Sequence, residues 1–89
     1  MRLPVGSVVL LPESDPVMVT GYFYTDPDNY DKLWDYCGIP YPEGITSDSK
    51  TFMFDHEQIK SVLFTGYMGD DYEYLMAKFD FLVGLWEKD

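Results

Sequence analysis

The chain has 89 residues, of which 46% are hydrophobic and 18% aromatic, so it is long and apolar enough to fold as one domain over residues 1–89. Six Lys and Arg against 16 Asp and Glu give a formal net charge of −10, which disfavours binding to nucleic acid or to an anionic membrane surface. The single cysteine excludes an internal disulfide bond and fits a cytoplasmic protein.

Two strands begin the predicted fold. The run GSVVLLP, residues 6–12, is apolar and bounded by Gly and Pro, and VMVTGYFYT, residues 17–25, follows after a turn. Side chains alternate along a strand, which predicts two opposite faces for the second run: Val17, Val19, Gly21 and Phe23 on one, and Met18, Thr20, Tyr22 and Tyr24 on the other. Gly21 within the run predicts a β-bulge or a sharp bend.

The middle of the chain predicts short elements. YDKLWDY, residues 30–36, favours a short helical piece, and residues 37–49 read as a loop. TFMFD, residues 51–55, predicts a strand, and DHEQI favours a single helical turn with Asp55 as its cap. KSVLFTGYM, residues 60–68, predicts a further strand, so the sheet is expected within residues 5–68.

A C-terminal helix is expected over residues 70–88. Asp70, with Glu73 three residues later, resembles a capping box that starts it. Apolar residues at steps of three and four predict the stripe that packs on the sheet: Tyr72, Leu75, Met76, Phe79, Leu82, Val83 and Trp86. The expected fold is therefore α+β, a curled antiparallel sheet of four or five strands, up to a small open barrel, with the helix packed across it.

The same helix carries a second apolar stripe. At about 100° per residue, Tyr74, Phe81 and Leu85 fall on the side opposite the first stripe. Either a loop or the segment 30–36 covers this stripe, or it is exposed and binds a protein partner, a second copy of the chain included.

The sequence favours a protein without catalytic residues, cofactor or metal. His56 is the single histidine, and a nucleophilic Cys37 activated by it would need a basic neighbour, whereas Asp35 lies two residues before Cys37. The spacing of Asp26, Asp28 and Asp31 lacks the glycine and the final glutamate of a calcium loop. We therefore expect no enzyme.

The loop CGIPYPEG, residues 37–44, is conformationally restricted. Its two prolines fix backbone torsions on either side of Tyr41, and Pro42–Glu43 suits the centre of a type I turn with glycine in fourth place. Two interpretations remain open. The loop presents Tyr36, Tyr41 and Glu43 to a partner at low ordering cost, or it is a structural corner whose Tyr41 packs on the sheet.

Four motifs occur in a familiar order: LPVGSVVLL at 3–11, MVTGY at 18–22, YPEG at 41–44 and FDHEQIKSVLFTGY at 54–67. In this the chain resembles a small domain-of-unknown-function family encoded beside LXG-type toxins of the type VIIb secretion system in Gram-positive bacteria. The resemblance extends from Leu3 to about Phe79. Two residues depart from the family pattern: Trp34 stands where a tyrosine is common, and Asp55 where asparagine is expected.

The resemblance implies a non-enzymatic accessory protein. Its expected role is that of a cytoplasmic chaperone or targeting factor that binds a cognate toxin before export, with the toxin's helical N-terminal LXG region as the partner. The alternative is an immunity protein whose acidic surface neutralises the toxin's effector domain. The residues expected to contact the partner are Tyr74, Phe81, Leu85, Tyr36, Tyr41 and Glu43.

Overall fold

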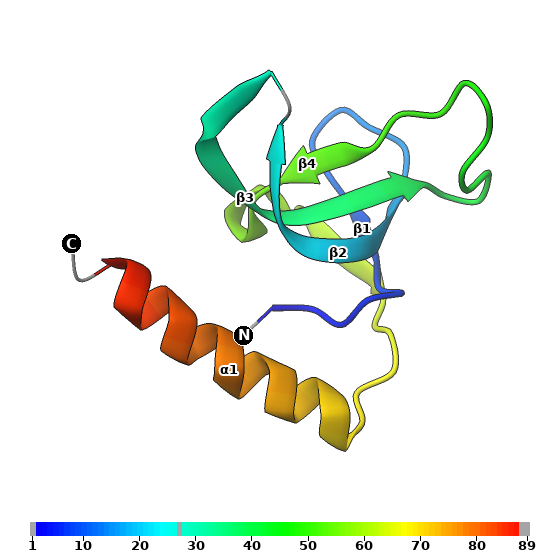
Figure 1. The fold of residues 1–89 in the computed structure, drawn as a ribbon. Coiled ribbons are helices and arrows are strands. Elements are labelled where there is room, and N and C mark those ends of the chain that lie inside the picture. The colour runs from blue at the N-terminus through cyan, green and yellow to red at the C-terminus, as the bar shows by residue number, and fades with distance from the viewer. Residues whose placement is uncertain (1, 27, 88–89) are drawn as a thin grey trace.

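A computed structural model of the chain describes residues 2–26 and 28–87. It contains one five-stranded antiparallel sheet, a short 3-10 helix η1 and a C-terminal helix α1 (Figure 1). The elements in chain order are β1 (Val8–Leu10), β2 (Val17–Asp26), β3 (Asn29–Pro40), β4 (Phe52–Phe54), η1 (His56–Gln58), β5 (Ser61–Phe64) and α1 (Asp70–Glu87).

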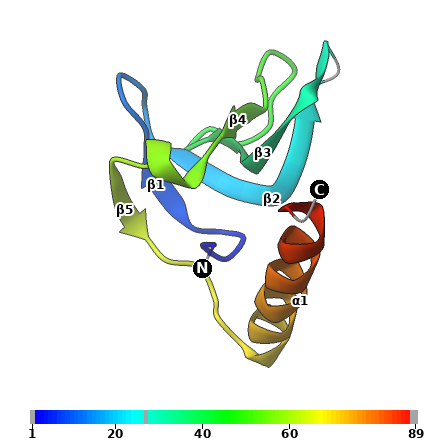
Figure 2. The same ribbon diagram turned by 90° about the vertical axis from the view of Figure 1, so that its left-hand side faces the viewer.

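The sheet has the strand order β4-β3-β2-β1-β5, so β4 and β5 are its two edges and the sheet does not close into a barrel. Figure 2 shows the sheet curling on one side of the molecule while α1 lies on the other, next to β2. The predicted α+β class, with a curled antiparallel sheet and a C-terminal helix, is confirmed.

The segment 30–36 is strand, and the prediction of a helical piece there is wrong. Residues 37–40, predicted as loop, continue the same strand β3. Pairing on both sides explains this, because Tyr36 lies opposite Tyr22 on β2 and opposite Phe54 on β4. A large aromatic side chain held between two such neighbours stabilises a strand more than local helical spacing stabilises a helix.

A β-bulge interrupts β2 where a glycine in the run predicted one. The register with β3 shifts between Val19 and Gly21, which leaves Thr20 as the extra residue. The shift reverses the alternation, so Tyr22 faces the core with Val17 and Val19 rather than the opposite side. The predicted division of β2 into two faces is therefore correct before the bulge and wrong for Tyr22.

The core lies inside the curl of the sheet. Five residues from β1 to β4 form it, with four partly buried side chains around them: Val9, Val17, Val19, Tyr36 and Phe54, surrounded by Leu3, Leu11, Tyr22 and Ile59. The ring of Tyr36 stacks on that of Phe54 with 5.1 Å between centroids. Burying each such side chain contributes about 1.5–3 kcal/mol, so this cluster is the main source of stability.

Helix α1 is attached through the first part of its inner stripe. Met76 is buried, and the ring of Phe79 makes edge contacts with Tyr22 and Phe23 at 5.2 and 4.8 Å between centroids. Leu82, also expected on this stripe, is 47% exposed. The side chain of Trp86 and residue 88 lie outside the described part of the chain.

The helix begins one residue earlier than its expected cap implies. The Glu73 N–H donates to the carbonyl of Gly69 at 3.2 Å, so Gly69 holds the N-cap position and Asp70 is the first helical residue. At η1 the predicted cap is confirmed. Asp55 precedes the turn, and its N–H donates to the side chain of Gln58 at 2.8 Å.

Candidate functional site

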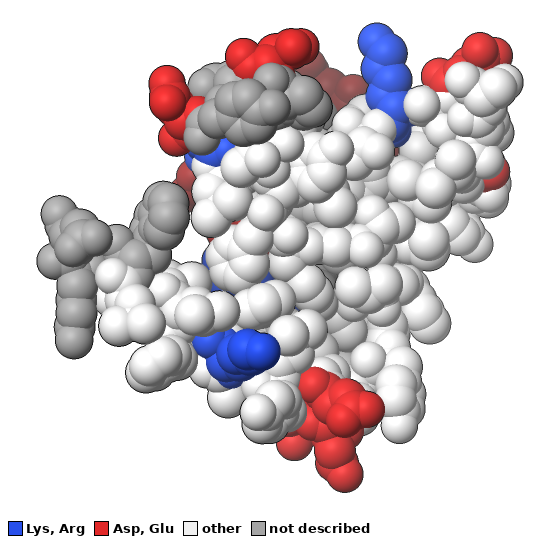
Figure 3. Space-filling model, in the orientation of Figure 1, with Lys and Arg blue, Asp and Glu red and all other residues white. Residues whose placement is uncertain are grey.

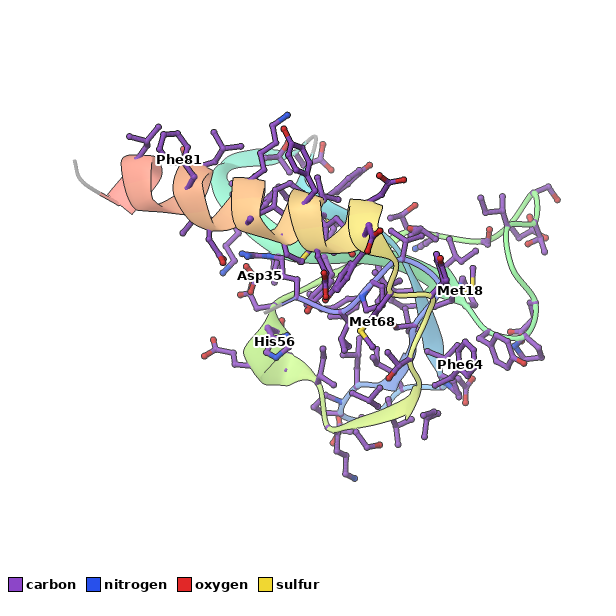
Figure 4. All side chains as sticks on the ribbon, turned by 90° about the horizontal axis from the view of Figure 1, so that it is seen from below. Met18, Asp35, His56, Phe64, Met68 and Phe81 are labelled. Atoms are coloured by element: carbon purple, nitrogen blue, oxygen red, sulfur yellow. The ribbon has the colours of Figure 1, made fainter. Side chains whose placement is uncertain are left out.

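The second stripe of α1 is open to solvent. The exposed fractions are 75% for Tyr74, 67% for Phe81 and 49% for Leu85. In Figure 4, Phe81 lies on the side of α1 that faces away from the sheet. The alternative in which a loop or residues 30–36 cover this stripe is therefore wrong. We call these three residues the outer helix face.

Charge around the outer helix face is uneven. Glu73 and Asp80 lie on one flank, and Lys78 occupies the helical position between Tyr74 and Phe81. Figure 3 shows a surface that is mostly uncharged, with acidic side chains gathered where α1 begins and at the outer loops. A strip that is apolar apart from Lys78 and has an acidic flank suits a partner that is largely apolar in the middle and basic at its margin.

The loop after β3 is fixed by backbone hydrogen bonds. The Tyr41 N–H donates to the carbonyl of Pro16 at 2.9 Å, and the Gly44 N–H donates to that of Pro40 at 2.8 Å. The closing bond therefore spans residues 40–44, not residues 41–44 as a type I turn requires. Tyr41 is 47% exposed and Glu43 is exposed, so both side chains are available to a partner.

Tyr36 has to be removed from the candidate contact residues. Its side chain is 0% exposed, because it lies on β3 in the centre of the core and not on the loop. Its hydroxyl oxygen accepts the Leu3 N–H at 2.9 Å and lies 2.7 Å from Nδ1 of His56. Burial raises the pKa of Tyr36, so this hydroxyl stays protonated and structural.

Three tyrosines from three elements hold the N-terminal segment. Besides Tyr36 from β3, Tyr22 from β2 donates to the carbonyl of Leu3 at 2.6 Å, and Tyr72 from α1 donates to the carbonyl of Arg2. Burial, and secondarily the neighbouring tyrosines, raise the pKa of Tyr22 to about 12. Sequence reasoning missed this tyrosine clamp. The one available signal, eight tyrosines in a short chain, does not say what they bind.

Arg2 itself is held from two sides. Its guanidinium forms a 2.8 Å ion pair with Asp35 and lies over the ring of Phe23 at 4.3 Å from the centroid. Asp35 also accepts the His56 N–H at 3.0 Å, which joins η1 to the same cluster. These contacts join the N-terminal segment, β3 and η1, and their role is structural. Among the described residues, the Nε of Arg2 is buried without a hydrogen-bond partner, while the other end of the guanidinium pairs with Asp35.

Cys37 and His56 do not form the catalytic pair considered from sequence. His56 reaches Tyr36, whereas Cys37 is the next residue along β3 and projects to the opposite face, with its Sγ 3.6 Å from the hydroxyl of Thr20. Across residues 2–26 and 28–87, no three His, Cys, Asp or Glu side chains gather as a metal site would require. Within the same ranges, no helix has the length and apolar character that crossing a bilayer demands.

The candidate contact residues form two surfaces. Tyr74, Phe81 and Leu85 share the outer helix face. Tyr41 lies beside Met18 and Phe64, which Figure 4 shows at the end of the molecule away from Phe81. One short segment of a partner therefore cannot contact both the outer helix face and Tyr41.

Comparison with known proteins identifies one family. The model of the family described as "Domain of unknown function (DUF4176)" matches residues 2–75. No curated protein and no solved structure matches the chain. The matched range includes Tyr41, Glu43 and Tyr74, whereas Phe81 and Leu85 lie C-terminal to it.

Proposed function

The chain belongs to the family DUF4176, and we propose that it is a non-enzymatic accessory protein that binds a helix of a protein partner through the outer face of α1. The finer form of the proposal is a cytoplasmic chaperone or targeting factor whose partner is the helical N-terminal region of an LXG-type toxin. That form is supported by the resemblance of the four sequence motifs to a family encoded beside such toxins.

The exposure of the outer helix face is the observation that carries the proposal. Tyr74 and Phe81 are seven residues apart and Leu85 follows after four, the spacing of a seam along which two helices pack. The helix has 18 residues and is therefore about 27 Å long, enough for a partner helix of several turns. Three large apolar side chains on one strip of solvent-facing helix are typical of a protein-binding surface.

Charge indicates the composition of the partner helix. Glu73 and Asp80 flank the seam, and the whole chain has a net charge of −10. A partner helix with Lys or Arg beside its apolar seam gains favourable pairs on that flank and a faster encounter. Lys78 within the seam adds a requirement, since an acidic or polar residue has to lie opposite it.

A co-purification experiment tests the proposal. The tagged full-length chain is co-expressed with the LXG-type toxin encoded beside its gene, split into its N-terminal region and its C-terminal effector domain. We expect capture of the N-terminal region alone. The double substitution Phe81→Asp and Leu85→Asp should abolish capture, because it places two charges in the apolar seam.

The matched control adds the same charge elsewhere. Ser47→Asp with Thr51→Asp alters two exposed residues of the loop between β3 and β4 and should leave capture unchanged. Circular dichroism of both variants should match the parent, since neither pair lies in the core. Unfolding of the Phe81, Leu85 variant would place this face in the core and contradict the proposal.

The same experiment separates the two functions that the resemblance implies. Capture of the effector domain alone, with loss of its toxic activity, would identify an immunity protein instead. A chain that elutes as a dimer, and as a monomer once Phe81 and Leu85 are substituted, would show that a second copy occupies the outer helix face.

A further inference from the structure

The outer face of the sheet carries a continuous apolar row. Met18 on β2 pairs with Ile39 on β3 and with Val8 on β1, and Val8 pairs in turn with Phe64 on β5. Residues paired directly across strands project to the same face. The core residues Val9 and Val17 are the chain neighbours of this row, so the row projects to the other face of the sheet. Val8 and Ile39 are themselves buried there, Met18 is half-buried, and Phe64 is the exposed end of the row.

An apolar row on this face is unexpected for a curled sheet with its core inside. A sheet with one solvated face alternates apolar and polar residues, whereas β1 (VVL) and most of β5 (SVLF) are apolar on both faces. Phe64 is 61% exposed and Leu63 is 55% exposed. Figure 2 places α1 on the far side from β5, so the helix does not cover these side chains.

The row lines one wall of a groove. A hollow of about 470 Å³ is lined by Val8, Met18 and Phe64 of this row together with Leu63, Tyr41 and Pro16. We call this hollow the outer sheet groove. Its lining is largely apolar, and its size suits one or two large side chains of a binding partner.

Acidic residues lie around the neighbouring hollow. This second hollow, of about 650 Å³, shares Pro16 with the first and is lined by Glu13, Asp15, Glu43 and Lys60 among others. The three carboxylates are exposed and, within residues 2–26 and 28–87, have no ion-pair partner. The surface beside the outer sheet groove is therefore net negative.

Two features restrict the occupant. A second copy of this acidic chain would bring like charges together at Glu13, Asp15 and Glu43, which is unfavourable. Strand addition to β5 is also disfavoured, because the register shift opposite Val8 and Val9 leaves Leu63 as a bulge in that edge. The occupant has to be recognised through its side chains.

We infer that the outer sheet groove binds a short segment of a partner protein in which apolar residues are followed by Lys or Arg. The apolar side chains occupy the groove between Met18, Phe64 and Tyr41, and the basic residues contact Glu13, Asp15 and Glu43. The inference does not depend on the proposed function, because the groove and the outer helix face lie on different sides of the molecule (Figure 4).

Synthetic peptides test the inference on the full-length chain. The probes are acetyl-VLVFKRK-amide, the same peptide with an acidic EDE ending, and acetyl-GSGSKRK-amide, each titrated into ¹⁵N-labelled protein. We expect saturable shifts at the amides of Met18, Tyr41 and Phe64 with the first peptide. The acidic ending should weaken binding about tenfold, and the peptide without apolar residues should not saturate.

Substitutions separate the charge from the apolar contribution. Glu13→Gln with Glu43→Gln should weaken binding of acetyl-VLVFKRK-amide about fivefold. Its affinity should then be close to that of the version with the EDE ending. The matched control, Asp48→Asn with Glu57→Gln, removes two exposed carboxylates outside both hollows and should change nothing. Phe64→Ser should weaken both apolar peptides.

Three results would overturn the inference. They are equal affinity for the basic and acidic endings, shifts confined to α1, and no saturation by any peptide at millimolar concentration. The Phe81→Asp, Leu85→Asp variant should bind the basic peptide as the parent does. Loss of toxin capture by this variant, with peptide binding retained, therefore tests the outer helix face separately from the outer sheet groove.

Discussion

Tyr72 on α1 donates its hydroxyl hydrogen to the main-chain carbonyl of Arg2, so the helix is tied to the N-terminal segment as well as to the sheet. Tyr72→Phe removes this bond and keeps the ring. We expect a loss of about 0.5–1.5 kcal/mol in the free energy of unfolding, measured by urea denaturation. Faster amide exchange in α1 should accompany it. Tyr74→Phe on the outer helix face is the control and should change neither quantity.

Removal of the Tyr36 hydroxyl should lower the free energy of unfolding more than removal of the Tyr72 hydroxyl. Tyr36→Phe leaves the Leu3 N–H without its acceptor in a part-buried position, which is expected to lower the free energy of unfolding by about 1–3 kcal/mol. Tyr24→Phe changes a more exposed tyrosine of the same hairpin and should be nearly neutral. Equal effects of the two substitutions in urea denaturation would contradict the structural role of Tyr36.

Alkaline pH should destabilise the fold through Tyr22. Its pKa is raised to about 12 in the folded chain, against about 10 when unfolded. Between these values the unfolded chain loses the Tyr22 proton and the folded chain keeps it. The contribution of Tyr22 to stability is therefore constant below a pH of about 10 and falls as the pH rises from about 10 to about 12. Urea midpoints measured across this range should fall, and Tyr22→Phe should fall less steeply. A midpoint that is independent of pH would refute the prediction.

Two glycines should respond oppositely to alanine. A Cβ on Gly38 would lie 2.6 Å from Cγ1 of Val17 and 2.7 Å from the carbonyl oxygen of Met18, so β2 has to move. Gly38→Ala is expected to destabilise by about 1–3 kcal/mol. Gly84 is helical with nothing within 4 Å of such a Cβ, and Gly84→Ala should stabilise by about 0.5–1 kcal/mol. Thermal denaturation of both variants checks the two signs.

Local sequence patterns predicted the elements that are determined by residues close together in the chain. The helix over Asp70–Glu87 follows from its own periodicity, and the bulge beside Gly21 follows from a glycine within a strand. The segment around Tyr36 could not be assigned in this way. Its apolar spacing suits a helix as well as a strand, and its pairing with Phe54 decides between them.

The tyrosine clamp and the apolar row on the outer face of the sheet depend on contacts between residues still farther apart in the chain. Tyr72 and Arg2 are 70 residues apart, and Tyr36 and Leu3 are 33 apart. In each pair, the sequence around one residue does not indicate its contact with the other. The pairing of Val8 with Phe64 likewise depends on the strand order, which places β5 next to β1. Exposure of the outer helix face, in contrast, was one of two outcomes that the sequence left open.

The placement of the outer helix face and the outer sheet groove on different sides of the molecule has a consequence for partners with two binding segments. The longest extent of the chain is 38 Å, which an extended linker of about twelve residues spans. Once a partner's helix is bound to α1, a basic segment of the same partner binds the outer sheet groove intramolecularly, at an effective concentration on the order of millimolar. Avidity of this kind exceeds either single affinity by about 10²–10⁴-fold, so two weak contacts suffice for a durable complex.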